Sequence, residues 1–236
     1  MAIPHVTEPY SEPDRIRAVY ARRGREDRYA GFQPAQVFTL QGVERRLLRL
    51  LRQQGALPLR DRQILEVGCG TGHWLREFVK WGADPAAVAG VDLLAGSLAA
   101  AKRRGAGGTR LVESDGAALP FPDGAFDVVG HFTVFTSILD PTLRRRVAQE
   151  TVRVLKPQGL ILWYDFHIAS PNNADVRPLG RREIATLFPR CQVTLRRATL
   201  ALPLARLLAP RLWLLCSLLE TIPLLRTHYI GVIRKP

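Results

Sequence analysis

From residue 63 onward the chain alternates short apolar segments with amphipathic ones, and this alternation constrains its fold more than any other feature. Five segments have the length and composition of buried strands: residues 64–67, 88–92, 110–113, 126–133 and 160–166. Helical segments lie between or after them, near residues 73–81, 95–104, 141–155 and 180–188. Strands that alternate with helices usually pair in parallel, and the helices cover both faces of the sheet. The sequence therefore predicts an α/β fold.

Further elements are expected on both sides of this region. Two basic helical stretches precede it, at about residues 13–24 and 34–54, and a strand candidate at 192–200, a leucine-rich excursion and a last strand at 228–234 follow it. A chain of 236 residues, 47% of them hydrophobic, suits one large domain. We expect a single domain made of an N-terminal helical cap (1–60), a core (61–200), a helical insertion (201–226) and the last strand (227–236).

The stretch I-L-E-V-G-C-G-T-G at residues 64–72 places three glycines directly after the first strand. A glycine-rich turn between a strand and a helix lets a ligand approach the backbone closely. A dinucleotide-binding turn would need a third glycine where His73 stands, and a phosphate-binding loop would need the sequence Gly-Lys-Ser/Thr, which does not occur. Glu66 is a further clue, because a carboxylate here would repel a phosphate and attract a cation.

Two more carboxylates follow the next strands. Asp92 ends the second strand, where an acidic residue accepts hydrogen bonds from ribose hydroxyls. Asp115 follows the third strand and is suited to an adenine amino group. These residues together favour a nucleoside that carries a positive charge and no pyrophosphate. S-adenosylmethionine fits, because it joins a ribose and an adenine to a sulfonium and an amino-acid head.

Five motifs occur here in the order and with the gaps of a known family. They are E-V-G-C-G-T-G, V-D-L-L, S-D-G-A-A-L-P-F, F-D-V-V and R-V-L-K-P-Q-G-L-I-L, within about residues 62–166. The chain resembles the class I S-adenosylmethionine-dependent methyltransferases, in the type 11 branch that includes the ubiquinone and menaquinone biosynthesis enzymes. The resemblance implies a Rossmann-like, seven-stranded, mostly parallel sheet with an antiparallel last strand and helices on both faces.

The same resemblance implies a cofactor, S-adenosyl-L-methionine, a product, S-adenosyl-L-homocysteine, and a set of binding residues. Glu66, Gly68, Gly70 and Gly72 would hold the methionine end, Asp92 the ribose, and Asp115 with Gly116 the adenine edge. Cys69, Leu93 and His131 complete the expected cofactor contacts. No metal site is expected, because the three cysteines are widely spaced and form no Cys-x-x-Cys pair.

Three residues near the ends of the fourth and fifth strands are candidates for catalysis. His131 is the first candidate for a general base, because imidazole titrates near physiological pH, and a core or loop histidine is the alternative. Asp165 and His167 end the fifth strand. Asp165 would orient a base or the acceptor, or else cap the loop at 170–173. A general base is needed if the acceptor is a hydroxyl.

The leucine-rich excursion at residues 202–225 is less standard for the family. An antiparallel last strand would place it beside the active site. It is not a membrane span, because Arg206, Arg211, Glu220 and three prolines interrupt it. Six leucines fall largely on one side: Leu204, Leu207, Leu208, Leu212, Leu215 and Leu219. The segment is either a lid on its own domain, a wall for a lipid-like acceptor, or a surface for peripheral membrane contact aided by the arginines.

Three functions remain open at this point. The first is methyl transfer, with O-methylation expected, to a small-molecule, glycan or lipid-linked acceptor. The second is a nucleic-acid (RNA) methyltransferase, suggested by a formal net charge of +13. However, the segment H-F-T-V-F after the fourth strand lacks the Asn/Asp-Pro-Pro-aromatic signature of amino-methylating enzymes, so nucleic acid is not the expected partner. The third is a non-catalytic cofactor-binding protein.

Location and assembly are less constrained. The first ten residues are polar and hold no apolar signal core, so the expected location is the cytoplasm, with membrane association left open. The oligomeric state is also left open.

Overall fold

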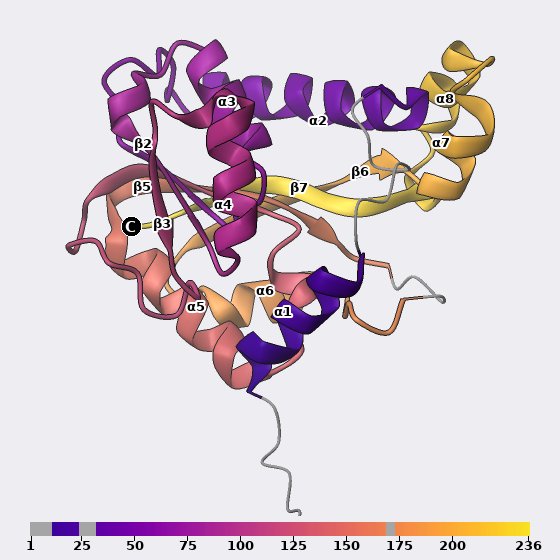
Figure 1. Ribbon diagram of the computed structural model, residues 1–236. Coiled ribbons are helices and arrows are strands. Elements are labelled where there is room, and N and C mark those ends of the chain that lie inside the picture. The colour runs from indigo at the N-terminus through magenta and orange to yellow at the C-terminus, as the bar shows by residue number, and fades with distance from the viewer. Residues whose placement is uncertain (1–10, 24–31, 169–172) are drawn as a thin grey trace, which may run out of the picture.

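The computed structural model describes residues 11–23, 32–168 and 173–236, and a seven-stranded sheet runs through its centre (Figure 1). The order across the sheet is β3-β2-β1-β4-β5-β7-β6. The strands are β1 (Ile64–Val67), β2 (Val88–Asp92), β3 (Arg110–Glu113), β4 (Phe126–Phe132), β5 (Leu155–Phe166), β6 (Gln192–Leu200) and β7 (Arg226–Arg234). β7 runs antiparallel to both of its neighbours, β5 and β6, and the other pairs of neighbouring strands are parallel. The predicted fold class is confirmed.

Helices cover both faces of this sheet, as Figure 1 shows. On one face lie α2 (Pro34–Gln53), α3 (His73–Lys80) and α4 (Ala95–Ala101), and on the other lie α1 (Glu12–Arg23), α5 (Pro141–Val154) and α6 (Arg181–Leu187). The insertion between β6 and β7 consists of α7 (Leu202–Leu208) and α8 (Trp213–Leu219). No helix within the described parts of the chain has the length and apolarity to cross a membrane.

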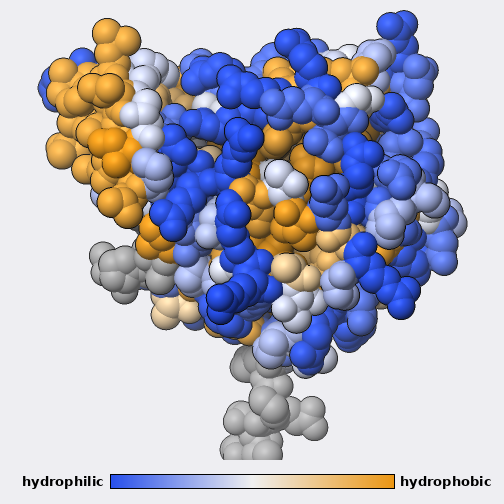
Figure 2. All heavy atoms as spheres, turned by 180° about the vertical axis from the view of Figure 1, so that it is seen from behind, coloured by the Kyte–Doolittle hydropathy of each residue, from blue (hydrophilic) through white to orange (hydrophobic). Residues whose placement is uncertain are grey.

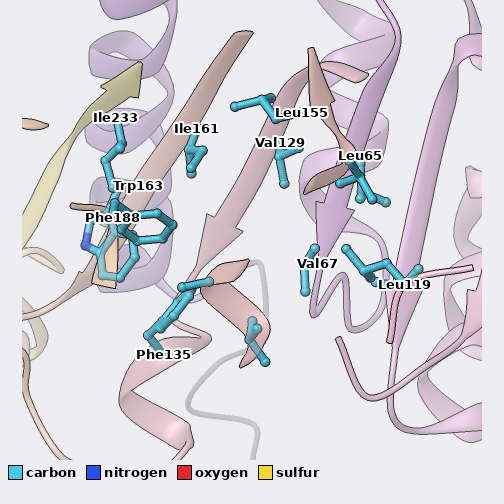
Figure 3. Close-up of a cluster of buried hydrophobic side chains, with 14 of the residues drawn as sticks. Leu65, Val67, Leu119, Val129, Phe135, Leu155, Ile161, Trp163, Phe188 and Ile233 are labelled. Atoms are coloured by element: carbon cyan, nitrogen blue, oxygen red, sulfur yellow. The ribbon is translucent and has the colours of Figure 1, made fainter. Parts of the chain in front are cut away.

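The alternation of side chains along each strand divides the core between the two faces. Leu65, Val129 and Trp163 face α5 and α6 and belong to the cluster drawn in Figure 3. Ile64 and Val128 face the opposite way and pack with α2 and α3. The central strands β1, β4 and β5 are buried on both faces over most of their length, which is the reason that most of their residues are apolar.

A third, smaller cluster attaches the insertion to the body of the protein. Ala205, Ala209 and Cys216 are buried there against Phe38 near the start of α2 and Leu200 at the end of β6. The prediction that six leucines share one side is wrong in part. Leu204, Leu208 and Leu219 pack on this cluster, whereas Leu207, Leu212 and Leu215 are exposed. The helical period is interrupted between α7 and α8, so the leucines on the two sides of the break do not continue one stripe.

Two boundary predictions need comment. The fifth strand begins at Leu155 rather than at residue 160, because Leu155 pairs with Phe126 before a register shift. Of the predicted N-terminal cap, residues 1–10 and 24–31 lie outside the described residues. The division of the chain as one domain stays a prediction.

Candidate functional site

The glycine-rich turn joins β1 to α3 at the carboxyl edge of the parallel strands. Gly68, Gly70 and Gly72 all have positive φ angles, of 71°, 52° and 74°. A Cβ atom at Gly68 would lie 2.7 Å from Val134, and one at Gly72 would lie 3.0 Å from Ala101, so these two positions are filled by the protein. A Cβ atom at Gly70 would meet nothing within 4 Å. Gly70 therefore borders open space, where a ligand can approach its backbone.

The end of β2 holds this turn in shape. The amides of Gly68 and Cys69 both donate to the carbonyl oxygen of Val91, at 2.8 and 2.9 Å. The Gly70 amide donates to Oδ2 of Asp92 at 2.7 Å, and the Leu94 amide donates to Oδ1 at 2.9 Å. Each carboxylate oxygen has capacity for a second hydrogen bond. Asp92 can therefore support the turn and accept from a ligand hydroxyl at the same time.

Glu66 is a buried carboxyl group on the same face of the sheet as Asp92. Its exposed fraction is 2%, and its Oε2 atom has no hydrogen-bond partner. Burial raises the pKa of Glu66 well above its usual range, and the nearby charge of Asp92 raises it further. Burial also raises the pKa of Asp92. A positively charged group placed beside them would stabilise both carboxylates, which makes this end of β1 suited to a cationic ligand.

Asp115 and Gly116 lie in the loop after β3, next to the end of β1. Asp115 is exposed, and its Oδ1 atom accepts a hydrogen bond from the Ala117 amide at 2.8 Å. A Cβ atom at Gly116 would lie 3.2 Å from Val67, so a larger residue would push this loop away from β1. Glu150 on α5 accepts a hydrogen bond from the Leu119 amide at 2.7 Å and thereby ties this loop to α5. Glu66, Asp92 and Asp115 thus belong to the adjacent strands β1 and β2 and to the loop after β3, at one edge of the sheet.

A comparison with protein families matches residues 64–159 to a model described as a methyltransferase domain. The matched stretch runs from the start of β1 into β5 and includes all three carboxylates and the glycine turn. Residues 64–159 form a class I S-adenosylmethionine-dependent methyltransferase domain. The family resemblance of the five sequence motifs is confirmed.

Relatives of the methyltransferase domain include enzymes named for quinone and lipid acceptors. Over 114 residues the chain is 38% identical to demethylmenaquinone methyltransferase of Thermus thermophilus, which covers 47% of this chain and 50% of that protein. Over 140 residues it is 34% identical to phthiotriol/phenolphthiotriol dimycocerosates methyltransferase 1 of Mycobacterium ulcerans, covering 54% and 49%. The chain therefore spans about half the length of these relatives.

Solved structures share the fold over more of the chain. The 1,6-didemethyltoxoflavin-N1-methyltransferase of Burkholderia thailandensis, with its substrate and S-adenosylhomocysteine bound, has a TM-score of 0.63 and 19% identity. It covers 98% of this chain, and the match covers 93% of that chain. The (4+2)-cyclase SpnF also matches, with a TM-score of 0.56, 19% identity, and coverage of 81% of this chain and 80% of its own. At such identities the likeness shows the fold alone.

Cys69 and Leu93 were also expected to contact the cofactor, and the structure shows what surrounds each of them. The Cys69 side chain is buried, and a Cβ atom at Gly90 would lie 2.9 Å from its sulfur. The thiol thus points into the core, where burial raises its pKa, and only the Cys69 backbone can face a ligand. The expected cofactor contact at Cys69 stays a prediction, and it would be made by the backbone. Leu93 is half-buried beside Asp92, and its contact with a cofactor stays a prediction.

His131 does not lie where the sequence suggested. It is part of β4, pairs with Val67 and Trp163, and is 1% exposed on the face covered by α5. The Thr151 hydroxyl donates to the Val147 carbonyl oxygen at 2.7 Å, so it accepts from His131 Nε2–H at 3.0 Å. Burial lowers the pKa of His131 to about 3. The predictions of a general base and a cofactor contact at His131 are wrong, because this is a core histidine that no ligand reaches.

Asp165 is also buried, with 1% of its surface exposed. Its carboxylate accepts from the Thr136 hydroxyl at 2.5 Å, the Thr136 amide at 3.2 Å and the Phe166 amide at 2.9 Å. Burial raises its pKa to about 6. These bonds hold the turn that follows β4, and the predicted role of Asp165 in orienting a base or the acceptor stays a prediction. Most of the loop at 170–173, which Asp165 was expected to cap, lies outside the described residues.

His167 is the one of the three catalytic candidates whose side chain is only half-buried. Its Nε2–H donates to the Arg226 carbonyl oxygen at 3.0 Å, and its ring stacks on Tyr229 at a centroid distance of 4.4 Å. Burial and the charge of Arg197 lower its pKa. The lowered pKa favours the neutral imidazole, and the tautomer set by Arg226 leaves Nδ1 as the basic nitrogen.

The structure adds residues that no motif indicated. On α1, Arg15 donates to the Ser137 carbonyl oxygen at 2.6 Å, Tyr20 contacts the Ser137 hydroxyl at 3.2 Å, and Glu12 accepts from the Leu139 amide. Helix α1 thereby lies across the loop that follows β4, at the same edge as the glycine turn (Figure 1). Arg15 and Ser137 are 122 positions apart, so local sequence patterns hold no signal for this contact.

The burial of His131 predicts a specific pH dependence of stability. Its pKa is 6.5 when unfolded and about 3 when folded, so its contribution is present above pH 6.5 and is lost as the pH falls below it. Asp165 acts in the opposite sense, because its raised pKa adds stability as the pH falls through about 6. We expect His131→Asn to reduce the slope of unfolding free energy against pH by about 1.4 kcal/mol per unit below pH 6.5.

Urea unfolding at several pH values measures this slope, and the overall stability of the variant does not affect the comparison of slopes. In the wild-type protein, the ring protons of His131 should show no titration by NMR across the range in which an exposed histidine titrates. An ordinary titration of His131, or equal slopes in both proteins, would contradict its assignment to the core.

Proposed function

We propose that the protein is an S-adenosylmethionine-dependent methyltransferase that acts on a small-molecule, glycan or lipid-linked acceptor. Two observations carry this proposal: the open space beside Gly70, and the buried, partnerless carboxylate oxygen of Glu66, with Asp92 as the neighbour of both residues. A neutral or anionic ligand would leave this buried oxygen without compensation, whereas a sulfonium or ammonium group supplies it. The match of residues 64–159 to the family supports the same conclusion.

Each residue of the edge has a proposed part in binding the cofactor. The Gly70 backbone and Glu66 would hold the methionine end, Asp92 would accept from the ribose hydroxyls, and Asp115 with Gly116 would meet the adenine edge. When bound, the cofactor supplies an electrophilic methyl group. The chain itself has to align the acceptor with that group and exclude water, which accounts for much of the rate in such displacements. Helix α1, tied to the loop after β4, is placed to help with the exclusion of water.

The acceptor class is proposed from the names of two relatives and from the position of the insertion. Two relatives are named for demethylmenaquinone and for phthiotriol dimycocerosates, and both names denote apolar molecules. The leucine-rich insertion lies at the same edge as the site, since it leaves the end of β6 and returns at the start of β7. We favour a lipid-like acceptor for these reasons. His167 is the proposed base if the acceptor is a hydroxyl, in place of His131.

Two other functions remain as competitors. The ubiquinone/menaquinone relative from Azotobacter vinelandii is named a C-methyltransferase, so methylation at carbon competes with methylation at oxygen. The cyclase SpnF has the same fold and is named for a different reaction, so a function other than methyl transfer is the second competitor. Detection of the product decides between these possibilities.

The cofactor proposal predicts an effect of one methyl group at Gly70. Gly70→Ala should weaken S-adenosylmethionine binding at least about tenfold in calorimetry, because the new Cβ enters the space proposed for the ligand. Gly55→Ala is the matched control, since Gly55 also has a positive φ of 65° and no atom within 4 Å of its Cβ position. Both variants should lose about 1–2 kcal/mol of stability from the left-handed backbone.

Only the Gly70 variant should lose binding, and neither NAD nor ATP should bind the wild-type protein. Equal affinity of the two variants would refute the placement of the cofactor. The Gly70 variant is a more specific test than Asp92→Ala. Asp92 accepts a hydrogen bond from the glycine turn, so its removal would disturb the turn as well as the proposed contact with the ribose.

The acceptor proposal is tested with methyl-labelled S-adenosylmethionine and cell extracts divided into an organic and an aqueous phase. Mass spectrometry should find the label mainly in the organic phase, and the fragment ions should place it on oxygen. His167→Gln should lower the labelling about 10²-fold or more without changing cofactor affinity, because it removes the base. Label on carbon, or full labelling by the variant, would argue against a base at His167. Label confined to the aqueous phase would exclude a lipid-like acceptor.

A further inference from the structure

The outer side of the insertion carries an exposed apolar surface. Figure 2 shows it as the hydrophobic lobe at the upper left, where α7 and α8 lie in that view. The most exposed members are Leu214 (84%), Leu224 (80%), Leu207 (75%) and Leu218 (64%). Together with four partly exposed residues, Leu212, Trp213, Leu215 and Ile222, they make up what we call the insertion surface.

The insertion surface is not a by-product of an unstable segment. Ala205, Ala209 and Cys216 on the inner side are buried against the end of β6 and the start of α2. The Trp213 ring meets Phe38 edge-on at 5.1 Å and is 37% exposed. The insertion is thus packed on the body of the protein while four of its leucines are largely exposed. A contiguous apolar patch of this kind usually marks a binding surface.

Charge favours one class of partner. Glu220 is the only acidic residue within 201–225, and its carboxylate turns inward to Arg46, at 3.0 Å and with 11% of the side chain exposed. Arg206 and Arg211, the two basic residues of this segment, are both exposed. The insertion surface therefore presents leucines with positive charge and no exposed negative charge of its own. A second copy of the chain would oppose these arginines with like charges.

We propose that the insertion surface docks on an anionic lipid bilayer. Short amphipathic helices of this composition insert their apolar side at the level of the lipid headgroups, and nearby arginines add electrostatic attraction. A half-exposed tryptophan at the border of the patch is suited to the same level. The two helices are too short to span, so the contact is peripheral.

Docking would also orient the methyltransferase site. The insertion returns to the sheet at Arg226 and Thr227, whose carbonyl oxygens accept from the ring and the amide of His167 at 3.0 Å each. A bilayer at the insertion surface would therefore lie close to the proposed acceptor side. This last step rests on the proposed function, whereas the docking itself does not.

The test is co-sedimentation of the full chain with vesicles, in the absence of cofactor. Wild-type protein should bind vesicles of equimolar phosphatidylcholine and phosphatidylglycerol more tightly than vesicles of phosphatidylcholine alone. Leu214→Ser with Leu218→Ser should weaken binding about tenfold or more, because both exposed side chains would lose their burial in lipid. Arg206→Gln with Arg211→Gln should reduce the preference for anionic vesicles.

A matched control separates docking from a general effect of charge. Gln53→Glu with Gln149→Glu removes two units of net charge, as the arginine pair does, and both glutamines are exposed. Gln53 ends α2, about 22 Å along the helix axis from Phe38 and about 10 Å from Arg46, the two α2 residues named above in contact with the insertion. This control should bind anionic vesicles nearly as well as the wild type, and all variants should keep the wild-type melting temperature.

Three results would overturn the proposal. One is wild-type binding that is absent or indifferent to lipid charge, and another is equal binding by the leucine variant and the control. The third is a stable dimer in sedimentation velocity that the leucine substitutions dissociate, which would assign the insertion surface to a second copy. Cofactor calorimetry on the same samples tests the proposed function separately. Absence of docking would leave the proposed function in place, and absence of cofactor binding would leave the docking in place.

Discussion

The hydrogen bond from the Gly70 amide to the Asp92 carboxylate connects the two strands on which the site depends. It forms within a turn that has positive φ angles at three alternate residues, Gly68, Gly70 and Gly72. Val91 completes the connection by accepting from two further amides of the turn. The helix α3 that follows then begins at a fixed position, and space stays open beside Gly70. Without this bond the open space and the two nearby carboxylates would not be held together.

The alternation of side chains along the strands decides which polar residues can meet a ligand. Glu66 and Asp92 face the side of α2, α3 and α4 and reach the carboxyl edge beside the turn. His131 lies on β4, the strand next to β1, and faces α5. It packs there against Phe135 and Trp163, which are labelled in Figure 3. Asp165 lies on that same side, and its carboxylate accepts hydrogen bonds from the amide and the hydroxyl of Thr136. Buried groups of similar chemistry thus have a proposed role in binding on one side of the sheet and stabilise the fold on the other.

Local sequence patterns predicted the limits of β1, β2, β3 and β6, because each is a short segment with branched apolar residues between turn or helical segments. They also predicted the carboxylates at the edge, since parallel strands end together. They could not predict the burial of His131, which depends on its pairing with Val67 and Trp163. The contact of α1 with Ser137 and the break between α7 and α8 were missed for the same reason. Long-range packing decides both, and neither leaves a periodic signal.

The central claim is that the carboxylates at the end of β1 and β2 select a cation, and proton release on binding tests it most directly. Calorimetry at mildly acidic pH, in buffers of different ionisation enthalpy, counts the protons released. S-adenosylmethionine should release more than S-adenosylhomocysteine, because its sulfonium lowers the raised pKa of Glu66, and Glu66→Gln should remove the difference. Equal release by the two ligands, or a difference that persists in the variant, would contradict the account.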